Sequence, residues 1–281
     1  MAENTRQEKS VKVNGLNLLY SDWGNEEKMP LLCLHGHGSQ ARVFDEFGDA
    51  MSPYYRVLAL NQRGHGGSDW APDGYARDRF VEDLSDFVDE LGLTRFVLVG
   101  LSMGGWHSFL YAPKNPERVE RIIIGDIAPE ATPQFVEYWL NRPSTPLEFP
   151  DVDTALLWGR STNPRASDER IHKDVQDKIY QRADGTWTHK ADPLILADPL
   201  VDLTDPAMVE RYWEGLAAIA CPILAVRGGL SPLVSDEVNE RMAQVAKDLT
   251  SVDIPDSGHP LTTEQYAQFI EVTSSFLGVR P

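Results

Sequence analysis

The sequence predicts an α/β fold in which helices flank a mostly parallel sheet and a helical cap is inserted into the chain. Apolar runs without polar alternation recur along the chain, as is typical of strands buried on both faces. Amphipathic segments separate them, because parallel strands need crossover connections. This alternation stops between residues 129 and 219 and then resumes. We therefore expect a core formed by residues 1–128 and 220–281, with a helical cap at 129–219.

Composition limits the partners of the chain. Its 281 residues are 42% hydrophobic, and 43 acidic against 26 basic side chains give a net charge of -17. This charge opposes a phosphate backbone, and no basic cluster is interleaved with aromatic residues, so nucleic acid is not expected as a partner. The polar N-terminus lacks an apolar leader, and no run is long enough to cross a bilayer. We expect a cytoplasmic protein with a small-molecule substrate and no membrane partner, and we make no prediction of its oligomeric state.

The elements of the core follow in order. Two strand-like runs flank Asn14-Gly15, a dipeptide typical of a tight β-hairpin, so the chain begins antiparallel. Residues 77–91 and 264–277 place apolar side chains at helical spacing and predict two amphipathic helices. The cap contains two helix-like pieces, 168–180 and 206–219. Buried strands are predicted at residues 31–34, 57–60, 96–99, 122–124 and 223–226, and a further strand is predicted at 251–254.

The most informative motif is Gly100-Leu101-Ser102-Met103-Gly104. It lies between a predicted strand and a segment that reads as helix, which is the context of a nucleophile elbow. Such a turn holds its serine in a strained backbone conformation, and small flanking residues let the neighbouring backbone pass close by. Ser102 is therefore the candidate nucleophile.

A serine hydroxyl needs a base within hydrogen-bond reach, and imidazole has a suitable pKa. His259 follows the predicted strand 251–254, which places it at the same sheet edge as Ser102. The oxyanion formed during attack needs two donors. The backbone N–H groups of Met103 and of His37, in the loop after strand 31–34, are the candidates. His35 and His37 lack a third ligand at metal-site spacing, so no metal is expected.

Several motifs together resemble the α/β-hydrolase fold superfamily, and the similarity is greatest to small serine esterases and lipase-like hydrolases with a helical cap. The resemblance implies an eight-stranded, mostly parallel sheet, a cap inserted after the sixth strand, and no cofactor. The motifs that carry it are His35-Gly36, the run Gln62 to Ser68, Gly100 to Gly105, Asp126 to Pro129, and Ser257 to His259.

The acid of the triad departs from the pattern of many relatives. Where they carry a carboxylate after the seventh strand, this chain has Ser231, which cannot compensate an imidazolium charge. Other members take the acid from the end of the sixth strand, and Asp126 closes the apolar run 122–124 there. We expect Asp126 to be the acid, with Asp236 as the second candidate and Asp256 as the third.

These residues predict a cofactor-independent serine hydrolase that cleaves carboxylic esters of small apolar or aryl substrates through an acyl-enzyme. Two alternatives stay open. The same triad could cleave a carbon–carbon bond, a lactone or a thioester, or the chain could be a ligand-binding protein without catalytic turnover. A nicotinamide enzyme is disfavoured, because the G-x-G-x-x-A pattern at 36–41 does not follow a first strand and Asn61 stands where an acid is needed. Three aromatic residues of the cap are candidates for the substrate pocket: Trp139, Trp158 and Trp187.

Overall fold

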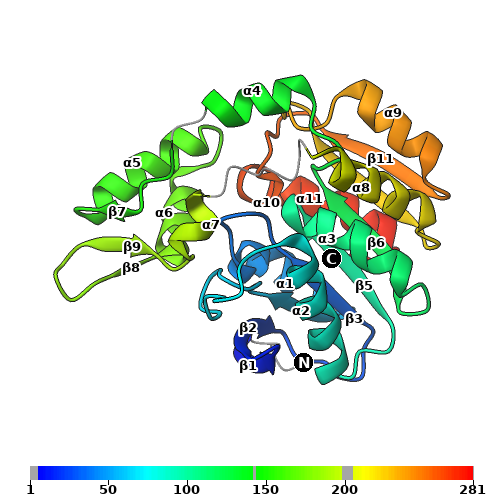
Figure 1. Ribbon diagram of the computed structural model, residues 1–281, viewed down its shortest axis with the longest axis horizontal. Coiled ribbons are helices and arrows are strands. Elements are labelled where there is room, and N and C mark those ends of the chain that lie inside the picture. The colour runs from blue at the N-terminus through cyan, green and yellow to red at the C-terminus, as the bar shows by residue number, and fades with distance from the viewer. Residues whose placement is uncertain (1–5, 142–143, 198–204, 281) are drawn as a thin grey trace.

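The computed structural model describes residues 6–141, 144–197 and 205–280 (Figure 1). Its centre is an eight-stranded sheet with the order β1-β2-β4-β3-β5-β6-β10-β11. Strand β2 is antiparallel to both of its neighbours, and all other pairs are parallel. The predicted α/β fold is therefore confirmed. The strands are β1 (Gln7–Val13), β2 (Leu16–Asp22), β3 (Pro30–Leu34), β4 (Arg56–Leu60), β5 (Phe96–Leu101), β6 (Val119–Gly125), β10 (Ile223–Gly228) and β11 (Leu249–Ile254).

The register of the sheet decides which loops meet at its carboxyl edge. Leu101, the last residue of β5, pairs with Gly125, the last residue of β6. Gly125 pairs in turn with Val226 of β10, and Gly228 at the end of β10 pairs with Ile254 at the end of β11. The residues that follow these four strands therefore emerge side by side at one edge.

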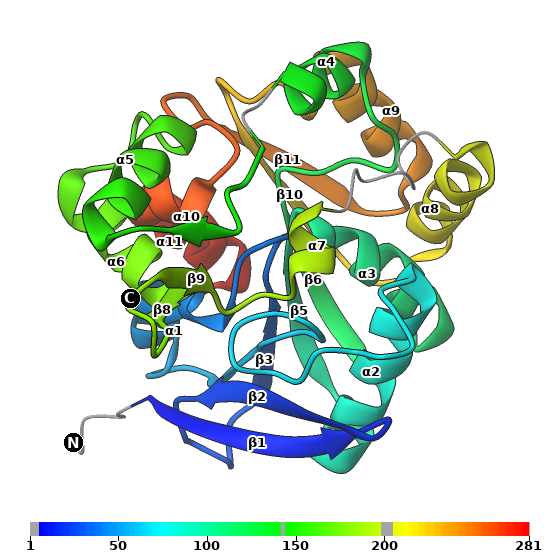
Figure 2. The same cartoon turned by 60° about the vertical axis from the view of Figure 1, so that its left-hand side comes forward.

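Helices cover both faces of the sheet (Figure 2). One face carries α1 (Asp45–Met51) and α11 (Tyr266–Leu277), whose apolar side chains share a buried cluster with the strands. The other face carries α2 (Arg77–Glu90), α3 (Met103–Tyr111) and α9 (Asp236–Val245), which pack into a second cluster. Two 3-10 turns at Ala41–Phe44 and Ala112–Lys114 and the short α10 (Leu261–Glu264) complete the core.

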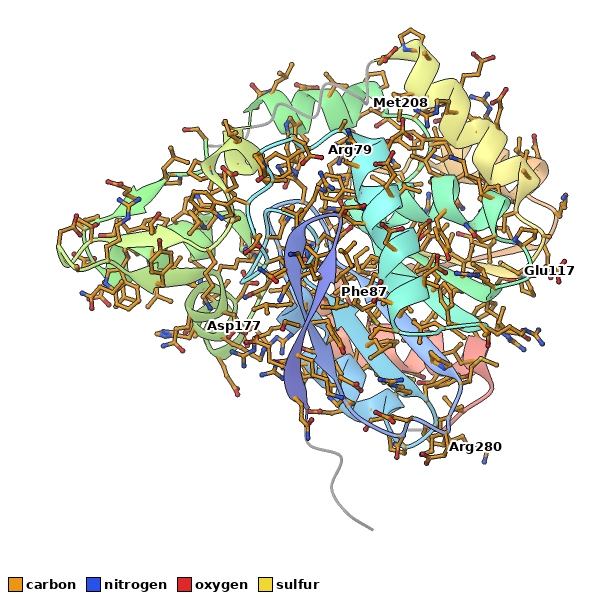
Figure 3. All side chains as sticks on the ribbon, turned by 60° about the horizontal axis from the view of Figure 1, so that its bottom comes forward. Arg79, Phe87, Glu117, Asp177, Met208 and Arg280 are labelled. Atoms are coloured by element: carbon orange, nitrogen blue, oxygen red, sulfur yellow. The ribbon has the colours of Figure 1, made fainter. Side chains whose placement is uncertain are left out.

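The N-terminal hairpin packs against α2. Asn14 and Gly15 have φ of 50° and 83°, the left-handed conformation that a two-residue hairpin turn needs. The ring of Tyr20 on β2 meets the edge of Phe87 on α2 with centroids 5.2 Å apart, and Figure 3 labels Phe87 on that helix. The antiparallel start of the sheet is thus tied to the same core as the parallel strands.

Residues 133–141 and 144–197, here called the cap segment, follow β6. Besides helices, the cap segment contains three short strands that the expected helical cap did not include, and they form a second sheet in the order β7-β9-β8. Phe149, Ile171 and Val175 belong to a small buried cluster of its own. The elements are α4 (Pro133–Asn141), β7 (Glu148–Phe149), α5 (Val152–Thr162), α6 (Asp168–Lys178), β8 (Ile179–Gln181), β9 (Trp187–His189) and α7 (Pro193–Ala197).

Helix α8 (Pro206–Ala218) falls inside the expected insertion 129–219, yet it packs on the core. The ring of Tyr212 stacks on Trp106 of α3 with centroids 5.8 Å apart. A Cβ at Gly215 would lie 2.2 Å from the carbonyl oxygen of Phe109, so the two helix backbones are in close contact. The structure therefore places α8 in the helical layer of the core.

Ion pairs fasten α6 of the cap segment to the core. Lys173 donates to Asp45 of α1 at 2.9 Å, and Arg170 donates to the carbonyl oxygen of Thr262 at 2.6 Å. Arg170 also pairs with Glu46. Across the described ranges, none of the helices has the length and apolar character needed to cross a membrane.

Candidate active site

Ser102 occupies a sharp turn between β5, which ends at Leu101, and α3, which begins at Met103. Its backbone has φ 51° and ψ -116°, a conformation that non-glycine residues rarely adopt. The N–H of Ser102 donates to the carbonyl oxygen of Gly125 at 2.9 Å, and its own carbonyl oxygen accepts from Gly105 at 2.8 Å. These bonds hold the strained turn in place.

Neighbouring glycines make this turn sterically feasible. A Cβ at Gly104 would lie 2.3 Å from the carbonyl oxygen of Leu34, and one at Gly100 would lie 2.4 Å from that of Gly104. Both contacts are with backbone, which cannot move aside without shifting β3 or α3. The glycines of the motif are thus required by close packing around the serine.

His259 lies in the loop between β11 and α10 and reaches the serine. Its Nε2 is 3.0 Å from Oγ of Ser102. The loop is braced from behind by Glu264, whose Oε2 accepts the N–H of Gly258 at 2.6 Å. The imidazole is therefore held within the range that proton transfer from the hydroxyl requires.

Asp126 completes a continuous hydrogen-bonded chain. Its Oδ2 is 2.8 Å from Nδ1 of His259, and its side chain is 1% exposed. Oδ1 accepts the N–H of Gly228 at 2.9 Å, while Oδ2 also accepts from Oγ of Ser231 at 2.5 Å. Because a carboxylate only accepts, Nδ1 of His259 carries the proton and Nε2 presents its lone pair to Ser102.

The other two candidate acids lie elsewhere. Asp236 is the first residue of α9, is 86% exposed and pairs with Arg227 at 2.8 Å. Asp256 is exposed in the loop after β11. The structure thus brings Ser102, His259 and Asp126 together and leaves Asp236 in a surface ion pair.

The two candidate oxyanion donors flank the serine. Met103 is the first residue of α3, so its N–H has no acceptor within the helix. His37 follows β3 in a loop that lies against the serine, because a Cβ at neighbouring Gly36 would be 3.1 Å from Cβ of Ser102. The N–H of Gly38 in the same loop donates to Nε2 of His65 at 3.2 Å. His65 therefore helps to hold the His37 loop.

Three buried histidines support the site from below without reaching the cavity. Burial lowers the pKa of His65 to about 4, and burial also holds the pKa values of His35 and His107 well below the ordinary value. Nε2 of His35 accepts the N–H of Gln62 at 3.1 Å, and Nδ1 of His107 is 2.6 Å from Oε1 of Gln62. These imidazoles are neutral near pH 7 and serve as hydrogen-bonding parts of the core.

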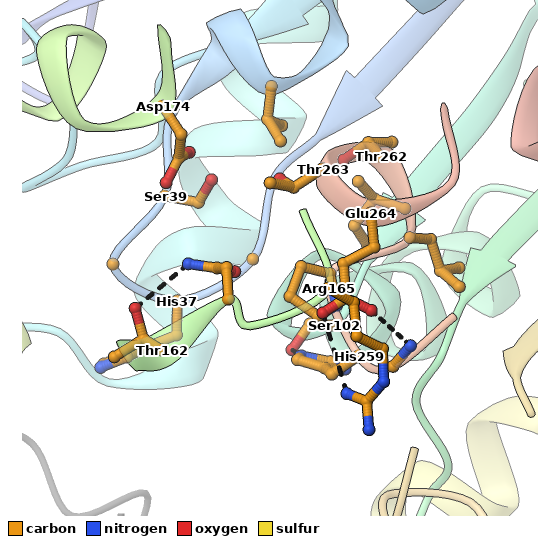
Figure 4. Close-up of a pocket in the computed structure, with 18 of the residues that line it drawn as sticks. His37, Ser39, Ser102, Thr162, Arg165, Asp174, His259, Thr262, Thr263 and Glu264 are labelled. Atoms are coloured by element: carbon orange, nitrogen blue, oxygen red, sulfur yellow. Dashed lines mark hydrogen bonds and ion pairs between the residues drawn. The ribbon is translucent and has the colours of Figure 1, made fainter. Parts of the chain in front are cut away.

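A cavity of about 800 Å³ opens above Ser102 and His259 (Figure 4). Side chains of α4, α5, α6 and α7 contribute to its wall, so the cap segment covers the serine. Of the three predicted pocket residues, Trp158 lines this cavity, and the other two are not among the described lining residues. Trp139 packs edge-on to His37 and to Phe135 instead, and Trp187 packs against the cap's own buried cluster.

Three residues of the site were missed by the sequence reasoning: Ser231 as a partner of Asp126, Arg165 in the cavity wall and Glu264 behind the His259 loop. No local motif marks them, because each lies in or beside a loop whose course depends on tertiary packing. In the described part of the chain, no group of three or more histidine, cysteine or acidic side chains is arranged to hold a metal ion.

Comparisons with known proteins agree with this architecture. A family described as the alpha/beta hydrolase fold matches residues 29–264. The chain is 29% identical over 276 residues to a 3-hydroxybutyrate-oligomer hydrolase of Cupriavidus necator, covering 93% of both proteins. It is 25% identical over 266 residues to an esterase of Mycobacterium tuberculosis, covering 92% of this chain and 85% of that protein.

The fold is also shared with solved structures. The structure of an E-2-(acetamidomethylene)succinate hydrolase superposes with a TM-score of 0.86 at 22% identity, covering 98% of this chain and 100% of that one. The two relatives named above are a hydrolase and an esterase, and the described residues of this chain include the serine turn and an eight-stranded, mostly parallel sheet. This chain belongs to the α/β-hydrolase family and is a hydrolase.

Proposed function

We propose that the chain hydrolyses carboxylic esters of small apolar or aryl substrates through an acyl-enzyme. Ser102 is the nucleophile, His259 the general base and acid, and Asp126 the carboxylate that orients the imidazole. One observation supports this above all: Oγ of Ser102, both ring nitrogens of His259 and Oδ2 of Asp126 form a single hydrogen-bonded chain with distances of 3.0 and 2.8 Å.

The chemistry follows from this arrangement. Oγ of Ser102 attacks the ester carbonyl carbon while its proton passes to Nε2 of His259. The negative charge on the former carbonyl oxygen is stabilised by the N–H groups of Met103 and His37. The tetrahedral intermediate then expels the alcohol, which takes the proton from His259. Water, deprotonated by the same imidazole, releases the acid and restores the serine.

The cavity wall supports an apolar or aryl substrate. The wall of the cavity that contains Ser102 has apolar surface from Trp158, Tyr138, Leu101 and Leu230. None of the steps above requires a cofactor, and the substrate is a small molecule that fits beneath the cap segment. A cavity of about 800 Å³ is within the range typical of small-molecule sites.

Fluorophosphonate labelling followed by intact mass measurement tests the nucleophile. The native protein should gain one adduct, and Ser102→Ala should gain none. Ser39→Ala is the matched control, because Ser39 is a second serine in the same cavity wall and its removal should leave the adduct in place. An unlabelled native protein would refute the assignment.

The bond that is cleaved is tested with one acyl group presented in several forms. Butyryl esters of p-nitrophenol, the butyryl thioester of N-acetylcysteamine and a γ-lactone should be compared on the native protein and on Ser102→Ala. We expect the highest Ser102-dependent kcat/KM for the ester. A higher value for the thioester or the lactone would move the proposal to that class, which the same three residues can serve.

A further inference from the structure

Arg165 brings a positive charge into the cavity beside the candidate base. It lies between α5 and α6 of the cap segment, and its side chain is 44% exposed. A Cβ at Gly258, the residue before His259, would lie only 3.1 Å from Nη1 of Arg165. Figure 4 shows Arg165 among the residues that line the cavity, with its ion pair to Glu264 drawn as a dashed line. A residue of the cap segment thus lies beside the loop that carries the candidate base.

Within the described ranges, most N–H donors of the Arg165 guanidinium have no hydrogen-bond acceptor. Its ion pair is with Oε1 of Glu264 at 4.0 Å, a distance too long for a hydrogen bond. Among the residues that the structure describes, Arg165 donates no hydrogen bond. Oε2 of Glu264 is occupied by the N–H of Gly258 at 2.6 Å, and that side chain is 1% exposed. Glu264 therefore lies next to Arg165 without accepting a hydrogen bond from it, and Arg165 lines the cavity with a side chain that is 44% exposed.

The other charged groups of the cavity wall are less available than Arg165 to bind an anionic ligand. Lys178 pairs with Asp174 at 2.8 Å within α6. Burial lowers the pKa of His189 to about 4, so this ring is neutral near pH 7. Glu137 is exposed on α4 and is itself an anion. Within the described part of the cavity wall, Arg165 is thus the cation whose donors remain available to a ligand.

We propose that Arg165 binds a free carboxylate on the substrate, so that the preferred substrates are esters that carry a second, unesterified carboxyl group. This inference rests on the proposed function and narrows it: the ester of that same site is otherwise apolar or aryl and carries one free carboxylate. The planar guanidinium offers paired N–H donors that match the two oxygens of a carboxylate. The partly desolvated cavity strengthens such a contact relative to open water.

The test compares matched pairs of substrates. Mono-p-nitrophenyl esters of glutaric, adipic, pimelic and suberic acid carry a free carboxylate, and p-nitrophenyl esters of monocarboxylic acids with the same number of carbons do not. For the native protein we expect kcat/KM to favour the acidic ester by roughly tenfold or more at one chain length. The preference should arise mainly from a lower KM.

Variants identify the responsible residue. Arg165→Gln should bring the ratio of acidic to neutral ester close to one while hydrolysis of the neutral ester persists, and Arg165→Lys should retain part of the preference. Arg182→Gln is the matched control, because Arg182 is also a cap arginine, is 39% exposed, and pairs with Glu148 away from the cavity. This control should keep the ratio of the native protein.

The possible failures are distinguishable. If the native protein shows no preference at any chain length, or if Arg165→Gln keeps the preference, the carboxylate site is overturned, while Ser102-dependent hydrolysis of the neutral esters still upholds the proposed function. If no ester is hydrolysed, the proposed function fails. In that case, adipate binding is measured by calorimetry on Ser102→Ala and on the double variant Ser102→Ala/Arg165→Gln. Loss of adipate binding in the double variant supports the carboxylate site, and equal binding in the two proteins overturns it.

Discussion

Ser231 donates a hydrogen bond of 2.5 Å to Oδ2 of Asp126, the same oxygen that faces Nδ1 of His259. Ser231 follows β10, and Asp126 follows the neighbouring β6. The position after β10 is where many related enzymes carry the acid itself. In this chain the carboxylate comes from one strand and a supporting hydroxyl comes from the next, and both meet at the imidazole.

Removing this hydroxyl should weaken the site without destroying it. In Ser231→Ala, Asp126 keeps the N–H of Gly228 but loses a donor to the oxygen that orients His259. We expect kcat for a p-nitrophenyl ester to fall about tenfold, because a hydrogen bond to a charged group contributes about 1.5 to 3 kcal/mol. Ser231→Thr retains a hydroxyl and should recover much of the loss. An unchanged kcat in Ser231→Ala would show that Gly228 alone suffices to hold the carboxylate.

Substituting the acid itself should have a much larger effect. Asp126→Asn keeps the shape of the side chain but favours the wrong tautomer of His259, so kcat should fall by roughly 10⁴. Asp236→Asn is the control, because Asp236 is 86% exposed and paired with Arg227. It should change kcat less than twofold. Steady-state kinetics of both variants test the assignment, and a reversed order of the two losses would transfer the acid to Asp236.

The positions of the three candidate triad residues were predictable because each follows a predicted strand of the sheet. The runs ending at Val99, Ile124 and Ile254 indicate parallel strands, and parallel strands end at the same edge of a sheet. The structure places Ser102, Asp126 and His259 after β5, β6 and β11 accordingly. Local sequence was sufficient to predict these positions, because the order and register of the strands bring the three following loops together.

Other features depend on packing that the sequence does not display. Strands β7, β8 and β9 contain two or three residues each, too few for any period to be recognised. Helix α8 has the same amphipathic pattern whether it covers a cap or a core. Arg165 lies beside Gly258 in the His259 loop, and ion pairs of Arg170 and Lys173 dock the following helix α6 on the core. No spacing along the chain encodes this approach.

The close packing around Gly104, next to Ser102, predicts that a larger residue at this position lowers the stability of the fold. Gly104→Ala places a methyl group 2.3 Å from the carbonyl oxygen of Leu34, so we expect the free energy of unfolding to fall by roughly 3 kcal/mol. Gly185→Ala is the control, because Gly185 has φ +90° and open space around its Cα. That variant should lose only about 1 to 2 kcal/mol, the cost of a left-handed conformation. Urea denaturation measures both, and equal losses would contradict the steric explanation.

The buried histidines make stability depend on pH. Burial lowers the pKa of His65 in the folded state to about 4, against an ordinary value of 6.5, so the unfolded chain binds more protons between these values. The stabilisation is fully present above pH 6.5 and is lost as the pH falls towards 4. At about 1.4 kcal/mol per pKa unit, His65 alone accounts for a loss of about 3 kcal/mol. His35 and His107 act in the same direction.

Urea denaturation of the native protein from pH 7.5 to 4 should therefore show a falling free energy of unfolding, and His65→Gln should show a shallower decline. Glutamine has a side-chain oxygen that can accept the N–H of Gly38, so the variant keeps a partner for the His37 loop. His172→Gln is the control, because His172 is exposed on α6 and its removal should leave the slope unchanged. Parallel curves for the native protein and His65→Gln would mean that His65 binds protons equally in the folded and unfolded chain, contrary to its burial.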